Sequence, residues 1–323
     1  MTFAASSPGN IFLCGEHAVV YGYPAITCSV ECRTRVLLTP LDAPDIRIHS
    51  ETCGTIEAEL EGGTVRPRTD NPELSVFLDL LSTLPLPTGL EAHITSDIPL
   101  KSGMSSSTAV LCSFLAACSD AFDLGIRPQA YYERLLPIQR NIHGGKASGS
   151  EIFSSSMGGF HHIQRDGDRV RARRLGELDL DIIIADTGVF APTFLTVGYH
   201  VPSLIDRKKE QVFEVFEAIG AVTERMQDAV ARGDRQRIGE LMDRNQLLLS
   251  ALGVSHPKLD DCITEARDAG ALGAKLSGSG WGGIMFALVE ADTRDAVRAA
   301  LERTRARIIA TTIGGQGTRK EEE

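Results

Sequence analysis

The hydrophobic pattern of this sequence changes near Ser107, and this change most constrains its fold. Before it, short apolar or alternating runs of the kind that form β-strands are separated by turn residues. After it, apolar residues recur at helical spacing, and small alanines between them allow close packing. We therefore expect a sheet followed by a buried helix. The expected strands span residues 10–14, 25–30, 34–39, 45–49, 55–60 and 90–94.

The second half alternates helical patterns with strand-like runs, which indicates an α+β domain. Between the halves we expect a helix from Pro128 toward residue 140, kinked at Pro137, and strands at 159–164, 170–174 and 181–185. Further on, the expected helices are 203–232, 235–252, 258–269 and 293–304, and the expected strands are 274–276, 284–289 and 307–312. The expected units are an α/β domain over 1–175, an α+β domain over 176–315 and a loose tail over 316–323.

Charge and cysteine content limit the possible partners. The 323 residues contain 33 Lys and Arg and 43 Asp and Glu, and the net charge of −10 argues against a general nucleic-acid binder. Any phosphate must then be held locally, by backbone donors and a few placed side chains. The seven cysteines form no Cys-x-x-Cys pair, and neither a signal peptide nor a membrane span is visible. We expect a cytoplasmic protein that binds neither nucleic acid nor a membrane.

A serine-rich loop at residues 97–109 precedes the helix that starts near Ser107. Its backbone N–H groups and the helix N-terminus would converge on an anion, with hydroxyls as additional donors. The alternative is an ordinary serine-rich helix cap. The loop is not a Walker A motif, because Gly-Lys-Ser/Thr is missing.

A glycine-rich loop at Ser277–Gly283 matches Gly-x-Gly-x-x-Gly, but it runs into a strand-like segment and not into a helix. Dinucleotide binding is therefore a poor fit. A turn that lets backbone approach a ligand and a simple hairpin remain equal alternatives. A third motif places Glu16 and His17 just after an apolar strand, where sites often lie, although each residue alone is typical of a surface or a satisfied core position.

In combination these motifs resemble the GHMP kinases. Residues 8–22 read Pro-Gly-x-x-x-Leu-x-Gly-Glu-His-Ala-Val-Val-Tyr-Gly, and the serine-rich and glycine-rich loops follow in the family's order. The first motif, with Asp186–Phe190 and Asn245–Gly253, is most similar to the archaeal mevalonate kinase branch. The resemblance implies a left-handed β-α-β N-terminal domain, a ferredoxin-like C-terminal domain, and ATP, Mg²⁺ and a small hydroxylated substrate in the cleft. It also implies a homodimer.

The resemblance also assigns candidate site residues. Ser107 would be the hydroxyl near magnesium, and the acceptor pocket would be lined by Glu16, His17, Thr193 and Gly280. The residues expected around the ATP phosphates are Lys101, Ser102, Gly103, Met104, Ser105, Ser106 and Ser107.

Three positions depart from the family's pattern. Asn10 replaces a lysine, Gln139 replaces a magnesium-ligating glutamate, and Glu151 replaces the catalytic aspartate. The family's Lys, Glu and Asp sum to one negative charge, and so do Asn10, Gln139 and Glu151. Glu151 can still accept a proton or orient a hydroxyl, whereas Gln139 offers magnesium only a neutral oxygen. Lys101 and Lys146, in flanking loops, are candidates for a replacement cation.

The phosphate-side loops depart as well. Ser105 stands where the family has glycine, so we expect its backbone to avoid positive φ. Trp281 also replaces a glycine. We expect its ring to stack on a base or substrate, or to fill the nucleotide cleft. Three functions follow: a mevalonate kinase with Glu151 as the base, a paralogous kinase for another hydroxylated metabolite, and a catalytically silent relative that binds a metabolite or a partner.

Overall fold

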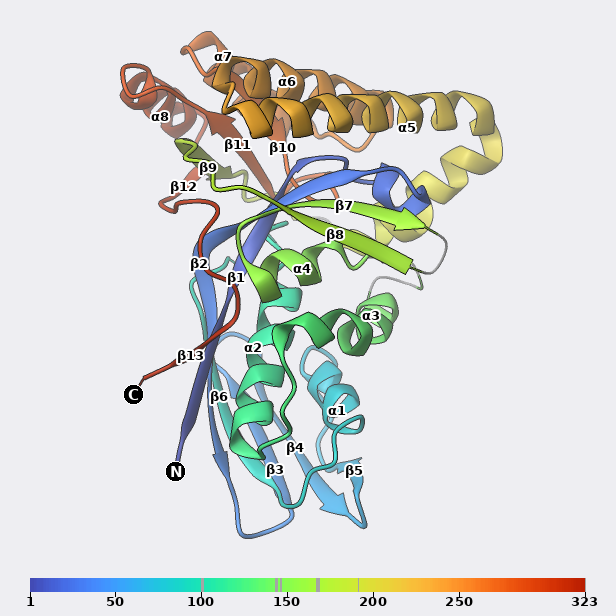
Figure 1. The fold of residues 1–323 in the computed structure, drawn as a ribbon, viewed down its shortest axis with the longest axis vertical. Helices are drawn as coiled ribbons and strands as arrows, with labels where there is room; N and C mark the ends of the chain where they lie inside the picture. The colour runs from blue at the N-terminus through green and yellow to red at the C-terminus, as the bar shows by residue number, and fades with distance from the viewer. Residues whose placement is uncertain (100–101, 143–144, 146, 167–168, 191, 323) are drawn as a thin grey trace.

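The computed structural model describes residues 1–99, 102–142, 145, 147–166, 169–190 and 192–322. Its N-terminal half is built on a nine-stranded sheet, in which β3 and β6 pair in parallel and the other neighbours pair antiparallel (Figure 1). Seven strands follow the order β13-β1-β2-β6-β3-β4-β5, and β7 joins β2 and carries β8. The strands are β1 (Phe3–Cys14), β2 (Ala25–Pro40), β3 (Asp45–Ser50), β4 (Gly54–Glu61), β5 (Thr64–Pro67), β6 (Leu90–Ser96), β7 (Phe160–Asp166), β8 (Arg169–Leu175) and β13 (Arg319–Glu321).

Four helices pack against one face of this sheet (Figure 1). They are α1 (Ser75–Leu81), α2 (Ser106–Ala121), α3 (Tyr131–Ile142) and α4 (Ser150–Met157). Helix α2 follows the predicted period change, and its apolar side buries Leu111, Phe114 and Leu115 completely. Phe114 packs against Phe77 of α1 with 4.8 Å between ring centroids. This core fixes the N-terminus of α2, and with it the serine-rich loop.

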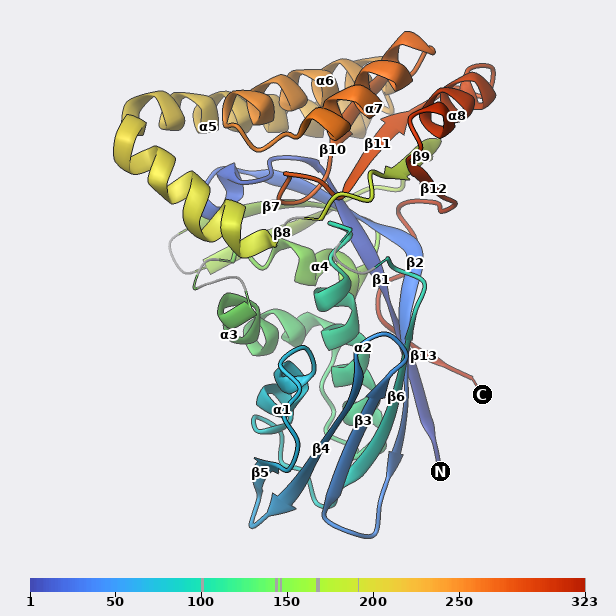
Figure 2. The ribbon, with the colours of Figure 1, turned by 180° about the vertical axis from the view of Figure 1, so that it is seen from behind.

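The C-terminal half contains a four-stranded sheet in the order β10-β11-β9-β12. Its long helices lie together at one end of the molecule, away from α1 and β5 (Figure 2). Asp234 caps α6 by accepting a hydrogen bond from the Arg237 N–H at 3.0 Å. The elements are β9 (Ile182–Asp186), the π-helical segment η3 (Phe194–His200), α5 (Val201–Arg232), α6 (Arg235–Ala251), α7 (Pro257–Asp268), β10 (Gly273–Leu276), β11 (Ile284–Leu288), α8 (Arg294–Arg303) and β12 (Arg307–Ile309).

The structure adds elements that the sequence pattern did not indicate. Helices α1 and α4 have only seven and eight residues, too short to show a helical period. The segment η3 continues into α5, which has a non-helical residue at Lys208. Helix α3 runs through Pro137. All seven cysteines are free thiols, and no helix in the described ranges is long and apolar enough to cross a membrane.

The prediction of a loose C-terminal tail is wrong for the described residues. Residues 319–321 form β13, which pairs with β1 so that Arg319 lies opposite Ser6. The buried Arg33 side chain donates hydrogen bonds to the carbonyls of Gln316 at 2.8 Å and Gly317 at 2.6 Å. Polar composition was misleading because the tail's partners are in β1 and β2, some 300 residues earlier.

Replacing Arg33 with methionine is expected to lower the free energy of unfolding by about 2 kcal/mol, because the two tail carbonyls lose a charged donor. Arg47→Met, at an exposed position of β3, is the control. Urea unfolding curves measure both. Equal midpoints for the two variants would contradict this role of Arg33.

Candidate functional site

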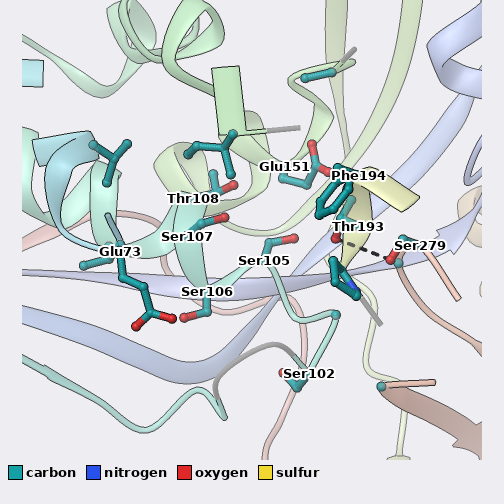
Figure 3. A pocket seen from close by; sticks show the side chains of 18 of the residues that line it. Glu73, Ser102, Ser105, Ser106, Ser107, Thr108, Glu151, Thr193, Phe194 and Ser279 are labelled. Carbon is teal, nitrogen blue, oxygen red and sulfur yellow. Dashed lines mark hydrogen bonds between the residues drawn. The ribbon is translucent and has the colours of Figure 1, made fainter. Parts of the chain in front are cut away.

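A cavity of about 670 Å³ lies where the two halves of the chain meet. Glu151, Thr193 and Ser279 gather on one side of the serine-rich loop, and Glu73 lies on the other side (Figure 3). The wall has four main parts: the serine-rich loop, the glycine-rich loop, the segment after β1, and the segment leading into η3. Further residues come from β3–β4, α1, α3 and α4. The cavity wall therefore includes residues of the serine-rich loop, the glycine-rich loop and the Glu16–His17 motif.

The serine-rich loop presents hydroxyl and N–H donors to this cavity. Gly103 has φ +84°, and a Cβ there would lie 2.9 Å from the Ser277 carbonyl oxygen. The Ser102 hydroxyl is buried and has no hydrogen-bond partner in the described part of the chain. Ser106 and Ser107, at the start of α2, are half-buried and line the cavity. The helix N-terminus adds partial positive charge, so this end of α2 can hold an anion.

Met104 faces the core, and Ser105, which lines the cavity, uses its hydroxyl within the protein. The Met104 side chain is fully buried in the core, and the Met104 backbone carbonyl accepts a hydrogen bond from the Asn10 N–H at 3.1 Å. Ser105 has φ +57°, so the expectation that it avoids positive φ is wrong. Its hydroxyl donates to the Asn10 side-chain oxygen at 2.9 Å, and this bond holds the unusual backbone in place.

Asn10 connects three parts of the site and does not itself line the cavity as described. Its side chain is completely buried. Besides accepting from Ser105, it donates to the Glu151 carbonyl at 3.2 Å and to the Ser155 hydroxyl at 3.0 Å. The residue that replaces the family's lysine therefore joins the serine-rich loop to α4.

Glu151 lies in the first turn of α4, half-buried, and lines the cavity beside Ser148. The turn before it uses Gly149 at φ +71°, where a Cβ would lie 2.5 Å from the Tyr132 ring. The glycine therefore allows α4 to begin close to α3. Glu151 and Ser107 both line the cavity (Figure 3). This arrangement suits a carboxylate that receives a proton from a bound hydroxyl.

Gln139 is buried in α3 and is not part of the described cavity wall. Its amide Nε2 donates to the Thr108 hydroxyl at 2.5 Å, which ties α3 to the first turn of α2. Its Oε1 atom has no hydrogen-bond partner among the described residues. Within those residues, no three His, Cys, Asp or Glu side chains form a group that could hold a metal ion. A metal would therefore depend on Ser107 and the oxygens of a bound phosphate.

Glu16 is bound within the protein. Its carboxylate forms a buried ion pair with Lys275 of β10, and it accepts a hydrogen bond from Asn245 of α6 at 2.9 Å. Lys275 also donates to the carbonyls of Phe12 at 3.2 Å and Leu276 at 2.6 Å. Both charges are removed from water, so the pair links the segment after β1 to the C-terminal half. A lysine inside the otherwise apolar strand 273–276 is the sequence signal that indicates a buried anionic partner.

His17 and Thr193 meet at Ser279 of the glycine-rich loop. The His17 Nε2 atom lies 3.1 Å from the Ser279 carbonyl oxygen, and the Thr193 hydroxyl lies 3.4 Å from the Ser279 hydroxyl (Figure 3). Burial lowers the pKa of His17 from 6.5 to about 4, so the ring is neutral near pH 7. With Nε2–H donating to Ser279, Nδ1 is left as an acceptor that has no partner in the described residues. The imidazole lines this end of the cavity together with Thr193 and Ser279.

The low pKa of His17 predicts a pH dependence of stability. Between pH 6.5 and 4 the unfolded histidine binds a proton that the folded one does not, so the free energy of unfolding falls as the pH is lowered through this range. His17→Gln should make this fall shallower, and His93→Gln, at an exposed position on β6, should leave it unchanged. Urea unfolding at several pH values measures the slope. A His17→Gln slope equal to that of the unchanged protein would contradict the assignment.

The glycine-rich loop packs directly on the serine-rich loop. The Ile284 N–H donates to the Ser102 carbonyl at 2.9 Å, and a Cβ at Gly283 would lie 2.7 Å from the same oxygen. A Cβ at Gly280 would lie 1.9 Å from the Val254 oxygen, so only glycine fits there. Trp281 is not among the described residues that line the cavity. The expectation that it stacks in or fills the nucleotide cleft is therefore wrong.

The two lysines proposed as replacement cations, Lys101 and Lys146, lie outside the described residues. None of the described residues that line the cavity is Lys or Arg.

Comparison with known proteins identifies this arrangement. Family models of the GHMP kinases match residues 74–159, for the N-terminal domain, and residues 226–307, for the C-terminal domain. The mevalonate kinase of Pyrococcus furiosus is 30% identical, with 100% of this chain and 99% of the relative covered. The chain belongs to the GHMP kinase family. It is accordingly assigned to the ATP-dependent phosphotransferases of that family.

Other GHMP kinases agree with this family assignment. The mevalonate kinase of Archaeoglobus fulgidus is 32% identical, covering 89% of this chain and 93% of the relative. The solved mevalonate kinase of Methanococcus jannaschii gives a TM-score of 0.81 at 21% identity, covering 97% and 98% of the two chains. A Lactococcus lactis galactokinase solved with galactose gives 0.82 at 21% identity, covering 99% and 95%. These structures confirm the predicted two-domain GHMP kinase fold.

Proposed function

We propose that this protein is a mevalonate kinase, which transfers the γ-phosphoryl group of ATP to the 5-hydroxyl of mevalonate. The observation that carries the proposal is the shared cavity, in which the Glu151 carboxylate and the N-terminus of α2 face one space. The full-length similarity to archaeal mevalonate kinases supports the choice of substrate. A solved L. major mevalonate kinase in complex with R-mevalonate, 24% identical with a TM-score of 0.78 over 97% and 96% of the chains, supports the fold in which such an acceptor binds.

The proposed roles follow from chemistry at each end of the cavity. The serine-rich loop and the N-terminus of α2 bind the phosphates through N–H and hydroxyl donors. Glu151 accepts the proton of the acceptor hydroxyl while the oxygen of that hydroxyl bonds to the γ-phosphorus. The bond from that phosphorus to the bridging oxygen breaks, and ADP leaves with the electron pair. His17 and Thr193 orient the acceptor.

The bound cation is proposed to arrive with the nucleotide. Mg²⁺ usually binds one or two protein ligands together with substrate phosphates, and the Ser107 hydroxyl suits that mode. When bound, it would neutralise phosphate charge. The Gln139 side chain donates a hydrogen bond to Thr108. We propose that it holds α3 against α2 and does not bind the metal. We propose that Lys101 and Lys146 supply the remaining positive charge, because the described wall contributes none.

The function is tested by incubating the protein with Mg-ATP and following ADP release with and without mevalonate, while calorimetry measures the binding of each ligand. Mevalonate-dependent ADP release supports the proposal. ATP binding with turnover only on other hydroxylated metabolites would indicate a paralogous kinase. Absence of both ATP binding and turnover would indicate a silent relative and would overturn the proposal.

A further inference from the structure

Trp281, the only tryptophan in the chain, points away from the cavity into a cluster of three segments. Its ring lies against His200, the last residue of η3, with 4.9 Å between ring centroids. Its indole N–H donates to the Gly253 carbonyl at 2.8 Å, and its backbone N–H donates to the Val254 carbonyl at 2.8 Å. The His200 Nε2 atom lies 3.0 Å from the Leu252 carbonyl oxygen. Trp281 thus joins the glycine-rich loop, the end of η3 and the turn after α6.

The backbone at Trp281 indicates that this cluster constrains the loop. Trp281 has φ +59°, in the left-handed region that residues with a Cβ avoid. The loop's glycines adopt positive φ freely, whereas a tryptophan does so only where its surroundings fix it. The hydrogen bonds and the ring contact of the indole supply that restraint. The residue that departs from the family's glycine therefore stiffens the loop.

The opposite side of the same loop holds the acceptor end of the cavity. Ser279, two residues before Trp281, contacts both His17 and Thr193. Thr193 immediately precedes η3, and His200 ends η3 against the indole. The Trp281 side chain therefore acts on the acceptor end by two routes, through the backbone to Ser279 and through η3 to Thr193.

We propose that Trp281 is a positioning residue, which holds the glycine-rich loop against η3 and so fixes where His17 and Thr193 meet the acceptor. The proposal rests on the proposed function. It concerns the acceptor end, because the contacts of the indole lead through Ser279 and η3 to His17 and Thr193. Loss of the indole should weaken acceptor binding and leave nucleotide binding nearly unchanged.

The first test compares Trp281→Phe, which keeps the ring and loses the donor, with Trp281→Gly, which restores the family's residue. Since small misplacements of binding groups are costly, Trp281→Gly should raise KM for mevalonate by about tenfold and KM for ATP by less than about twofold. Trp281→Phe should lie between it and the unchanged protein. Tyr199→Ala, at an exposed position in η3 next to His200, is the control and should change neither constant.

A double variant tests whether the indole acts through His200. His200→Ala should raise KM for mevalonate in the same way, and because the two residues act as one unit, the double variant should exceed the larger single effect by less than about twofold. Multiplication of the two single effects, an equal rise in both KM values, or unchanged KM values would each overturn the proposal.

Amide hydrogen exchange gives a readout that does not need turnover. In Trp281→Gly, peptides covering 194–200 and 14–18 should exchange faster, whereas peptides of β3 and β4 should not change. Faster exchange confined to residues 277–283 would overturn the positioning role. If the unchanged protein does not phosphorylate mevalonate, the proposed function fails by itself, and this exchange pattern still decides the role of Trp281.

Discussion

Replacing Lys275 with methionine is expected to destabilise the protein by about 3–5 kcal/mol, because the change leaves the buried Glu16 carboxylate without its cation. Lys275 is completely buried, and Glu16 is 1% exposed. A charge in such a place cannot be rehydrated without opening the contact between β10 and the segment after β1. The loss should appear as a lower midpoint in urea unfolding, measured at constant pH.

Two variants separate the ion pair from other effects of the substitution. Lys209→Met, at an exposed position of α5, should leave the midpoint unchanged. The double variant Glu16→Gln/Lys275→Met should be more stable than Lys275→Met alone, since no unpaired charge remains. A double variant whose loss equals the sum of the two single losses would contradict the buried pair, as would a Lys275→Met variant as stable as the unchanged protein.

Replacing Glu151 with glutamine is expected to lower kcat by about 10²–10⁴ with little change in KM for either substrate, because a general base is lost while the cavity keeps its shape. The amide is nearly isosteric with the carboxylate but cannot take the proton of the acceptor hydroxyl. Steady-state ADP release with saturating Mg-ATP and mevalonate measures the effect.

Glu133→Gln is the matched control for Glu151. Glu133 is also in the first turn of a helix, α3, but its side chain is exposed and away from the cavity. Its kcat should equal that of the unchanged protein. A Glu151→Gln variant that retains kcat, with unfolding midpoints equal for all three proteins, would exclude Glu151 as the base.

Local patterns predicted the elements that carry the site. Helix α2 was evident from the period of Leu111, Phe114 and Leu115, and both loops were evident from composition. Strand β2 was predicted in two pieces, because Glu31 and Arg33 interrupt its apolar pattern. In the structure Arg33 donates hydrogen bonds to the C-terminal tail, and Glu31 lies beside Arg33. The missed parts of the fold depend on partners distant in sequence.

The candidate site shows the same division more sharply. The motifs indicated Ser107, Glu151 and His17 as candidate site residues, and all three line one cavity. No local pattern could reveal that Glu16 is paired with Lys275, 259 residues later. Nor could it reveal that Asn10, at the position where the resemblance expects a lysine, forms hydrogen bonds with Ser105 and with α4. The roles of substituted residues were set by contacts, and composition alone could not supply those contacts.

Phosphorus NMR of the unchanged protein with Mg-ATP and mevalonate tests most directly whether this cavity phosphorylates mevalonate. We predict that the ATP resonances are replaced by those of ADP together with an equimolar phosphomonoester on the 5-hydroxyl of mevalonate, and that Glu151→Gln suppresses both. ATP that persists, or that yields only inorganic phosphate while mevalonate stays unmodified, would contradict the claim.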